Sequence, residues 1–136
     1  MIVVDTNILC YYILPSGPFT ASAEGVWQRD PDWNAPLLWR SEFRNVLADR
    51  IRAGEMSLLE AFQSAARAEA ILQGREFTIH MEEVLRLAAR SGCTAYDCEF
   101  VALAERLAIP LVTMDREVLR AFPETARSPR RFLAGK

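Results

Sequence analysis

Two aspartates in this sequence stand where buried strands are expected to end. Asp5 directly follows the branched apolar run Ile2 to Val4, and Asp115 follows the run Leu111 to Thr113. In α/β folds, ligand sites are built beyond the carboxyl ends of the strands. Each aspartate also precedes an expected helix, so helix N-capping explains either one taken alone equally well.

A third acid, Glu42, lies on the apolar side of an expected helix. Trp39 precedes it by three residues and Val46 follows it by four, and side chains at these spacings share a helix face. Burying an unpaired carboxylate costs several kcal/mol, so Glu42 is expected to have a partner. A buried ion pair is the ordinary alternative, although the nearby Arg40 and Arg44 are directed to other faces.

Asp97 repeats this pattern in a later helix. Val101 and Ala104 follow it at helical spacing, so the acid is directed along the packed face. The competing explanation is that Asp97 answers Thr94 in a motif that resembles a capping box. Capping and catalysis do not exclude each other. Glu99 is rotated from Asp97 by ~200°, which predicts a solvated surface acid.

Two acids at strand ends and two on inward helix faces can converge on one pocket. Like charges packed together repel and raise one another's pKa values, and a divalent cation removes that cost. Sites made only of carboxylates select magnesium or manganese, which prefer oxygen ligands. Such ions activate water and stabilise attack at phosphorus. We therefore predict a site for Mg²⁺ or Mn²⁺ at Asp5, and at Glu42, Asp97 and Asp115 if the acids converge.

The elements that would position these acids alternate between strands and helices, with no hairpin turn signals between them. We expect strands at 2–4, 33–35, 77–79, 109–113 and, at the edge, 132–133. We expect helices at 7–14, 19–29, 37–52, 57–73, 81–90 and 94–107, and from Asp115 to near Pro123. Pro15 is expected to end the first helix, and 16–18 to form a loop. This order predicts a three-layer α/β/α sandwich with a central, mostly parallel sheet.

Composition restricts the class of protein. The chain of 136 residues fits one domain, 1–136, and its formal net charge of -2 gives no overall basic field. The 3 cysteines form no CxxC pair and there is 1 histidine, which disfavours a disulfide framework or a zinc site. No apolar stretch approaches the ~20 residues of a membrane span. We expect a cytoplasmic protein that is not in a membrane.

The blocks around the four acids resemble those of PIN-domain ribonucleases, specifically the VapC toxins of toxin–antitoxin pairs. The resemblance covers nearly the whole chain, and its order and spacing are specific. The blocks that carry it are Val4-Asp5-Thr6-Asn7, Ser41-Glu42, Tyr96 to Ala104, and Leu111 to Asp115. Departures from the family pattern are Cys98 in place of alanine and Val118 in place of phenylalanine, while Glu117 has no assigned role.

The resemblance implies that Asp5, Glu42, Asp97 and Asp115 form the catalytic, metal-binding quartet, supported or oriented by Thr6, Asn7 and Thr113. It implies a PIN-like fold in which metal-bound water cleaves single-stranded or looped RNA. It also implies a homodimer and a cognate antitoxin that covers the groove. The helix 57–73 and the one before it can form an apolar face for that antitoxin, or can use their apolar residues for core packing.

Three other classes of protein share part of this pattern. A receiver domain also has an aspartate after its first strand, but it needs a lysine on a late strand, and the only lysine here is Lys136. A haloacid-dehalogenase-type phosphatase uses Asp-x-Asp, where this chain has Asp5-Thr6-Asn7. The remaining alternative is a PIN-fold module that binds RNA or a protein without cutting.

Overall fold

A single parallel sheet runs through the protein. The structure is a computed structural model that describes residues 1–14 and 17–136. Its strands, all paired in parallel, are arranged in the order β3-β2-β1-β4-β5. Their bounds are β1 Ile2–Val4, β2 Trp33–Pro36, β3 Glu76–Phe77, β4 Leu111–Val112 and β5 Ala126–Arg127.

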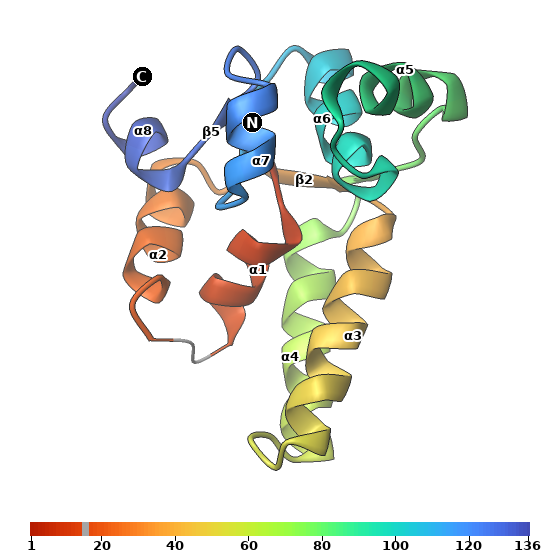
Figure 1. Cartoon of the computed structure of the whole chain (residues 1–136). Helices are drawn as coiled ribbons and strands as arrows, with labels where there is room; N and C mark the ends of the chain where they lie inside the picture. Colours follow the sequence, from red (N-terminus) through yellow and green to blue (C-terminus); the bar gives the residue numbers. More distant parts are fainter. Residues whose placement is uncertain (15–16) are drawn as a thin grey trace.

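Helices cover this sheet on both sides, which confirms the expected three-layer α/β/α sandwich (Figure 1). They are α1 Thr6–Ile13, α2 Thr20–Arg29, α3 Leu38–Arg52, α4 Leu58–Leu72, α5 Met81–Ser91, α6 Ala95–Leu107, α7 Arg116–Ala121 and α8 Pro129–Leu133. Helices α3 and α4 form an antiparallel pair whose far end projects beyond the rest of the domain (Figure 1). No helix in the described part of the chain is long and apolar enough to cross a membrane.

The winding of the chain reverses at the centre of the sheet. From β1 the chain moves outward through β2 to β3, and then α5 and α6 carry it back to β4, on the other side of β1. Helix α6 packs against β1, β2 and β4. The neighbours β1 and β4 therefore flank the point where the strand order reverses, which is where ligands bind in open α/β sheets.

Most helix boundaries follow the local signals in the sequence. Ser57 and Glu60 form the predicted capping box, with reciprocal hydrogen bonds of 3.1 Å between each side chain and the other residue's N–H. Gly92 ends α5 at φ 75°, a left-handed conformation that suits glycine. The Thr94 hydroxyl accepts the Asp97 N–H at 3.1 Å and caps α6 as expected.

The expectation of an edge strand at 132–133 was wrong, because these residues belong to α8. Ser128 caps that helix and Pro129 occupies its first turn, a pairing that favours a helix start. The last strand is instead β5, paired with β4 through Leu111 and Ala126. The third strand begins at Glu76 and ends at Phe77, and the fourth is limited to Leu111–Val112. The expectations for Pro15 and Ser16 lie outside the described residues.

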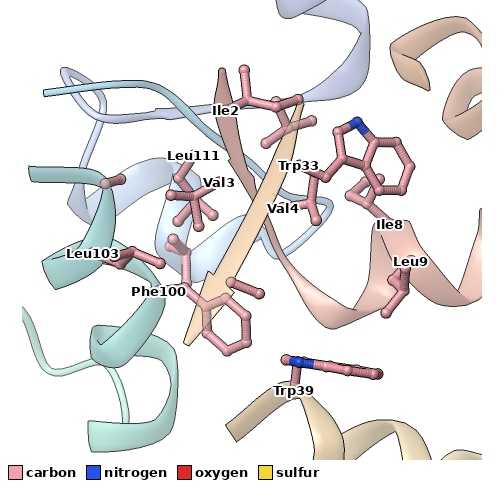
Figure 2. Close-up of a cluster of buried hydrophobic side chains, with 14 of the residues drawn as sticks. Ile2, Val3, Val4, Ile8, Leu9, Trp33, Trp39, Phe100, Leu103 and Leu111 are labelled. Atoms are coloured by element: carbon pink, nitrogen blue, oxygen red, sulfur yellow. The ribbon is translucent and has the colours of Figure 1, made fainter. Parts of the chain in front are cut away.

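The hydrophobic core surrounds β1 on both sides. Figure 2 shows Phe100 and Leu103 of α6 on one side of the strand, with Ile8, Leu9 and Trp39 on the other. All of these side chains are buried. The three cysteines are also buried and free. Because the core fixes β1 against helices in both layers, the residues that follow β1 start from a rigid position.

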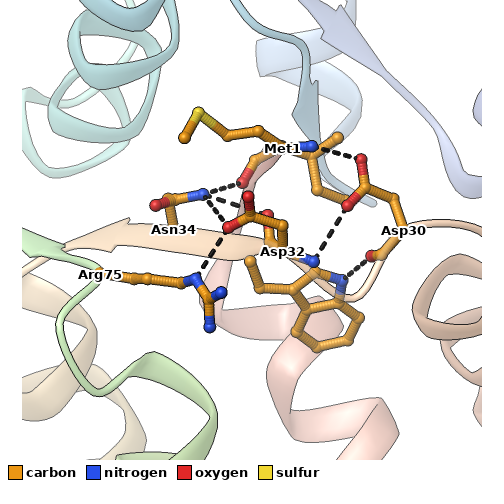
Figure 3. Close-up of polar contacts among 7 residues, drawn as sticks. Met1, Asp30, Asp32, Asn34 and Arg75 are labelled. Carbon is orange, nitrogen blue, oxygen red and sulfur yellow. Dashed lines mark hydrogen bonds and ion pairs between the residues drawn. The ribbon is translucent and has the colours of Figure 1, made fainter.

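A polar cluster fixes the amino-terminal ends of β1 and β2 (Figure 3). The terminal ammonium of Met1 pairs with Asp30 at 2.6 Å, and Arg75 pairs with Asp32 at 2.8 Å. The buried Asn34 amide donates to the Ile2 carbonyl at 3.2 Å and to the Asp32 carbonyl at 3.0 Å. Asn34 thereby joins the two strands at the edge of the sheet opposite to their carboxyl ends.

Removing the Asn34 amide should destabilise the fold. Asn34→Ala leaves the buried Ile2 carbonyl without this donor, which costs about 1–3 kcal/mol. We expect a fall of several degrees in the thermal unfolding midpoint, measured by circular dichroism. The control is Arg86→Ala, which removes an exposed pair with Glu82 and should leave the midpoint almost unchanged. Equal midpoints for both variants would contradict this role of Asn34.

Candidate active site

The fold brings the four predicted acids to one pocket of about 420 Å³. Asp5 follows β1 and Asp115 lies beyond β4, at the carboxyl ends of two adjacent strands. Glu42 is near the start of α3, which follows β2, and Asp97 is in the first turn of α6, which runs back toward the start of β4. All four side chains therefore reach the same edge of the sheet, at the reversal of strand order.

Asp5 occupies the N-cap position of α1, but its side chain makes no capping hydrogen bond within the described part of the chain. Its Oδ2 instead accepts a hydrogen bond of 2.6 Å from the Thr113 hydroxyl. The backbone N–H of Asp5 donates to the Val112 carbonyl at 3.0 Å, which ties the residue to β4. The capping explanation therefore fails for Asp5, and its carboxylate lines the pocket.

Thr113 and Asn7 connect the two strand ends. The fully buried Thr113 hydroxyl donates to Asp5 and accepts the Asp115 N–H at 3.0 Å. Asn7 donates weakly to Asp5 Oδ2 at 3.5 Å, and its Oδ1 accepts the Met114 N–H at 3.3 Å. Both side chains thus lie where they contact the Asp5 carboxylate and the backbone after β4.

Asp115 does cap its helix. Its Oδ1 accepts the N–H groups of Glu117 at 2.8 Å and Val118 at 3.1 Å. The same residue also lines the pocket. Capping and a place in the site therefore coexist at Asp115, because these bonds use only one of its two carboxylate oxygens.

Glu42 is held by Thr6. The Thr6 hydroxyl, itself buried, donates to Glu42 Oε1 at 2.6 Å. Arg40 pairs instead with Glu76 at 2.8 Å, and Arg44 donates to Ser41. The fully buried face of α3 is formed by neighbouring positions, which include Phe43, and not by Glu42 itself. Glu42 is therefore half-buried at the border of the core, with a fixed orientation toward the pocket.

Burial and neighbouring acids raise the pKa values of Asp5, Glu42 and Asp97. Burial is the largest cause for Asp5, and together with the charges of Glu42 and Asp97 it raises the Asp5 pKa to about 7, against the opposing hydrogen bond from Thr113. Burial also raises the pKa values of Glu42 and Asp97, and nearby acids add to the effect in both cases. The pocket is therefore a concentration of negative charge that a cation would relieve.

The donor set fits a hard divalent cation. All four acids offer only oxygen, which magnesium and manganese prefer. As the side chains stand, no three His, Cys, Asp or Glu residues among those described are close enough to hold one ion. The chemistry of the site therefore suits such an ion, while the observed positions are those of separate carboxylates.

Sequence reasoning missed part of the pocket wall, which includes Cys10, Tyr11, Val46 and Arg50. The signal was available as spacing, because Val46 and Arg50 follow Glu42 at intervals of four on one helix face. Burial raises the pKa of the Cys10 thiol to about 12. Cys10 is therefore a neutral thiol at physiological pH and not a nucleophile.

The expectation that Glu99 is a solvated surface acid was wrong. Glu99 is half-buried, and burial raises its pKa. Its charge also raises the pKa of Glu42. Glu117 affects Asp97 in the same way. The charges of Glu99 and Glu117 therefore act on members of the quartet. The sequence spacing alone did not indicate this.

Comparison with known proteins agrees with this architecture. The family model of the PIN domain matches residues 2–125. Ribonuclease VapC3 of Pyrobaculum aerophilum is 29% identical over 86 residues, which is 63% of this chain and 61% of that protein. The matched part thus spans less than two thirds of this relative.

Solved structures share the fold at lower sequence identity. PAE2754 from Pyrobaculum aerophilum superposes with a TM-score of 0.76 at 23% identity, covering 98% of this chain and 94% of that one. FitAcB from Neisseria gonorrhoeae gives 0.72 at 15%, covering 96% and 99%. A toxin-antitoxin complex from Klebsiella pneumoniae gives 0.66 at 15%, covering 95% and 98%.

The raised pKa of Asp5 predicts a pH-dependent stability. The folded chain keeps this proton up to about pH 7, whereas the unfolded chain releases it near 3.9. The free energy of unfolding therefore falls as pH rises through this window. In EDTA at pH 8, we expect Asp5→Asn to unfold at a temperature several degrees above that of wild type. Near pH 4, the two proteins should unfold at the same temperature.

The matched control for this effect is Asp49→Asn, an exposed aspartate on α3 that pairs with Arg52. It should show no comparable gain at pH 8. The measurement is thermal unfolding followed by circular dichroism at both pH values. If Asp5→Asn is no more stable than wild type at pH 8, the ionised Asp5 carboxylate does not destabilise the fold at that pH, contrary to the prediction.

Proposed function

Because the chain belongs to the PIN-domain family, we propose that it is a divalent-metal-dependent endoribonuclease and the toxin of a toxin–antitoxin pair. The observation that carries this proposal is the convergence of Asp5, Glu42, Asp97 and Asp115 on one pocket at the reversal of strand order. The similarity to Ribonuclease VapC3 supports RNA as the substrate.

In this proposal the four acids bind Mg²⁺ or Mn²⁺, and the hydroxyls of Thr6 and Thr113 orient Glu42 and Asp5. When bound, such an ion activates water and stabilises the charge that develops on the phosphate. Asn7 and the cap formed by Asp115 fix the loop after β4, so that the strand ends do not shift during turnover. The chain needs no nucleophile of its own.

A protein partner is supported by exposed apolar residues on α4. Leu58, Leu59 and Phe62 are 58%, 65% and 62% exposed. They belong to the first turns of α4, and this end of the α3–α4 pair projects from the domain (Figure 1). Exposed apolar patches mark interaction sites. Structural neighbours include a toxin-antitoxin complex. We assign this face to a cognate antitoxin.

The remaining parts of the proposal concern assembly and location. We take residues 1–136 as a single domain, place the protein in the cytoplasm and expect a homodimer. The alternative is a PIN-fold module that binds RNA or a protein without turnover. The two functions differ in whether the intact pocket cuts RNA.

The nuclease proposal is tested by cleavage of transfer and ribosomal RNA fragments by the purified, partner-free protein. We expect cutting with magnesium or manganese and none with EDTA. Asp97→Asn keeps the backbone N–H that Thr94 accepts, so the helix start is preserved. Its cleavage rate should nevertheless fall at least about 100-fold, equivalent to about 2.7 kcal/mol in the activation barrier.

The matched control is Glu105→Gln, which neutralises an acid on the same helix that pairs with Arg90 outside the pocket. This variant should cut like wild type. If neither wild type nor Asp97→Asn cuts any RNA, but both bind it equally, the binding module replaces the nuclease as the function of this chain.

The antitoxin proposal predicts a separable defect on α4. Expression of wild type should arrest growth, and co-expression of the protein encoded immediately upstream should relieve the arrest. Phe62→Glu places a charge on the exposed apolar face, so it should still arrest growth but escape relief. Gln63→Glu introduces the same charge on an adjacent exposed position and should still be relieved. Relief of Phe62→Glu would exclude this face as the binding site.

A further inference from the structure

The pocket that holds the four acids extends between α1 and α3, away from the sheet. We call this extension the trough; it is lined by Cys10 and Tyr11 of α1 and by Val46 and Arg50 of α3. Arg50 lies eight residues after Glu42 on the same face of α3, which is ~12 Å along the helix axis. The trough therefore leads from the acids to a chemically different end.

Charge differs between the two ends. Among the described residues that line the pocket, Arg50 alone carries a positive charge, while the acids are gathered at the strand ends. The field of Arg50 reaches the interior, where it lowers the pKa of Cys10 against the larger, opposing effect of burial. A phosphate chain is repelled by carboxylates and attracted by a guanidinium, which grips phosphate through two parallel hydrogen bonds.

Tyr11, which lines the trough together with Arg50, belongs to an aromatic pair. The half-buried ring of Tyr11 is 5.1 Å from that of Phe19, which is 41% exposed. Proteins that hold single-stranded nucleic acid combine cationic grooves with aromatic rings on which bases stack. A duplex keeps its bases stacked on one another, so Tyr11 can serve this role only for unpaired bases.

We propose that the trough binds the single-stranded RNA segment next to the scissile phosphate, with Arg50 pairing a backbone phosphate and Tyr11 stacking a base. This inference rests on the proposed function. The ~12 Å that separates Arg50 from Glu42 along the helix axis leaves room for more than one nucleotide between the acids and the phosphate at Arg50. Arg50 and Tyr11 are thus positioning residues for the substrate strand.

The test is binding of a fluorescein-labelled, unstructured RNA followed by anisotropy, with Asp97→Asn as the parent so that no cutting occurs. We expect Arg50→Gln to weaken binding about fivefold and to lower the slope of log K against log salt by about 0.7, the value for one phosphate of a single strand. Arg50→Lys should keep most of the slope. Tyr11→Leu should weaken binding about fivefold or more without changing the slope. Tyr11→Phe, which keeps an aromatic ring, should bind RNA as tightly as the parent.

The matched control is Arg52→Gln, which removes a 75% exposed cation of the same helix that lies outside the trough and pairs with Asp49. Its affinity and slope should equal the parent's, and all variants should keep the parent's thermal midpoint. The same RNA annealed to its complement should bind less tightly to the parent and be insensitive to Tyr11→Leu.

Two results would overturn the inference. If the parent binds RNA but Arg50→Gln and Tyr11→Leu behave like Arg52→Gln, the trough is not an RNA site. A protein partner then becomes its candidate occupant. If the parent binds no RNA, this inference fails, while the proposed function is still decided by whether wild type cleaves RNA. If binding depends on Arg50 and Tyr11 but wild type does not cleave RNA, the trough is an RNA site and only the nuclease proposal fails.

Discussion

The hydrogen bond from the Thr113 hydroxyl to Asp5 is the interaction on which the site depends. It holds a buried carboxylate beside other carboxylates, although burial and like charge raise its pKa to about 7. The same hydroxyl accepts the Asp115 N–H, so one side chain fixes both strand ends. A site of concentrated negative charge can persist only because such neutral groups hold each acid in place.

The rest of the fold supplies the rigidity that this arrangement requires. Buried side chains from α1, α3 and α6 enclose β1 on both sides (Figure 2). At the opposite edge, Asn34 and the ion pair of Met1 with Asp30 fix the strand starts (Figure 3). Stability is thus concentrated at one edge of the sheet and in its centre, while the other edge carries groups that destabilise each other. Binding of a cation would offset this cost.

Most of the elements followed from local patterns. The Ser57 capping box, the left-handed Gly92 and the apolar run Ile2 to Val4 each act through neighbouring residues, and each appears as expected. The two errors had different causes: at Phe132 a local helix-start signal decides the structure, whereas at Glu99 tertiary packing decides the burial. Phe132 lies in a helix because Ser128 and Pro129 start one, and Glu99 is half-buried although its spacing suggested exposure.

The sequence by itself determined which residues could do chemistry, because carboxylates at strand ends and on inward helix faces are costly unless they are used or paired. Their meeting depends on the strand order, which brings β4 beside β1 through hydrogen bonds between distant segments. Only the tertiary structure showed that Asp5 does not cap its helix while Asp115 does, and that Tyr11 of α1 lines the same pocket as the acids. Those features depend on side-chain orientation and on the approach of separate helices, which no local pattern encodes.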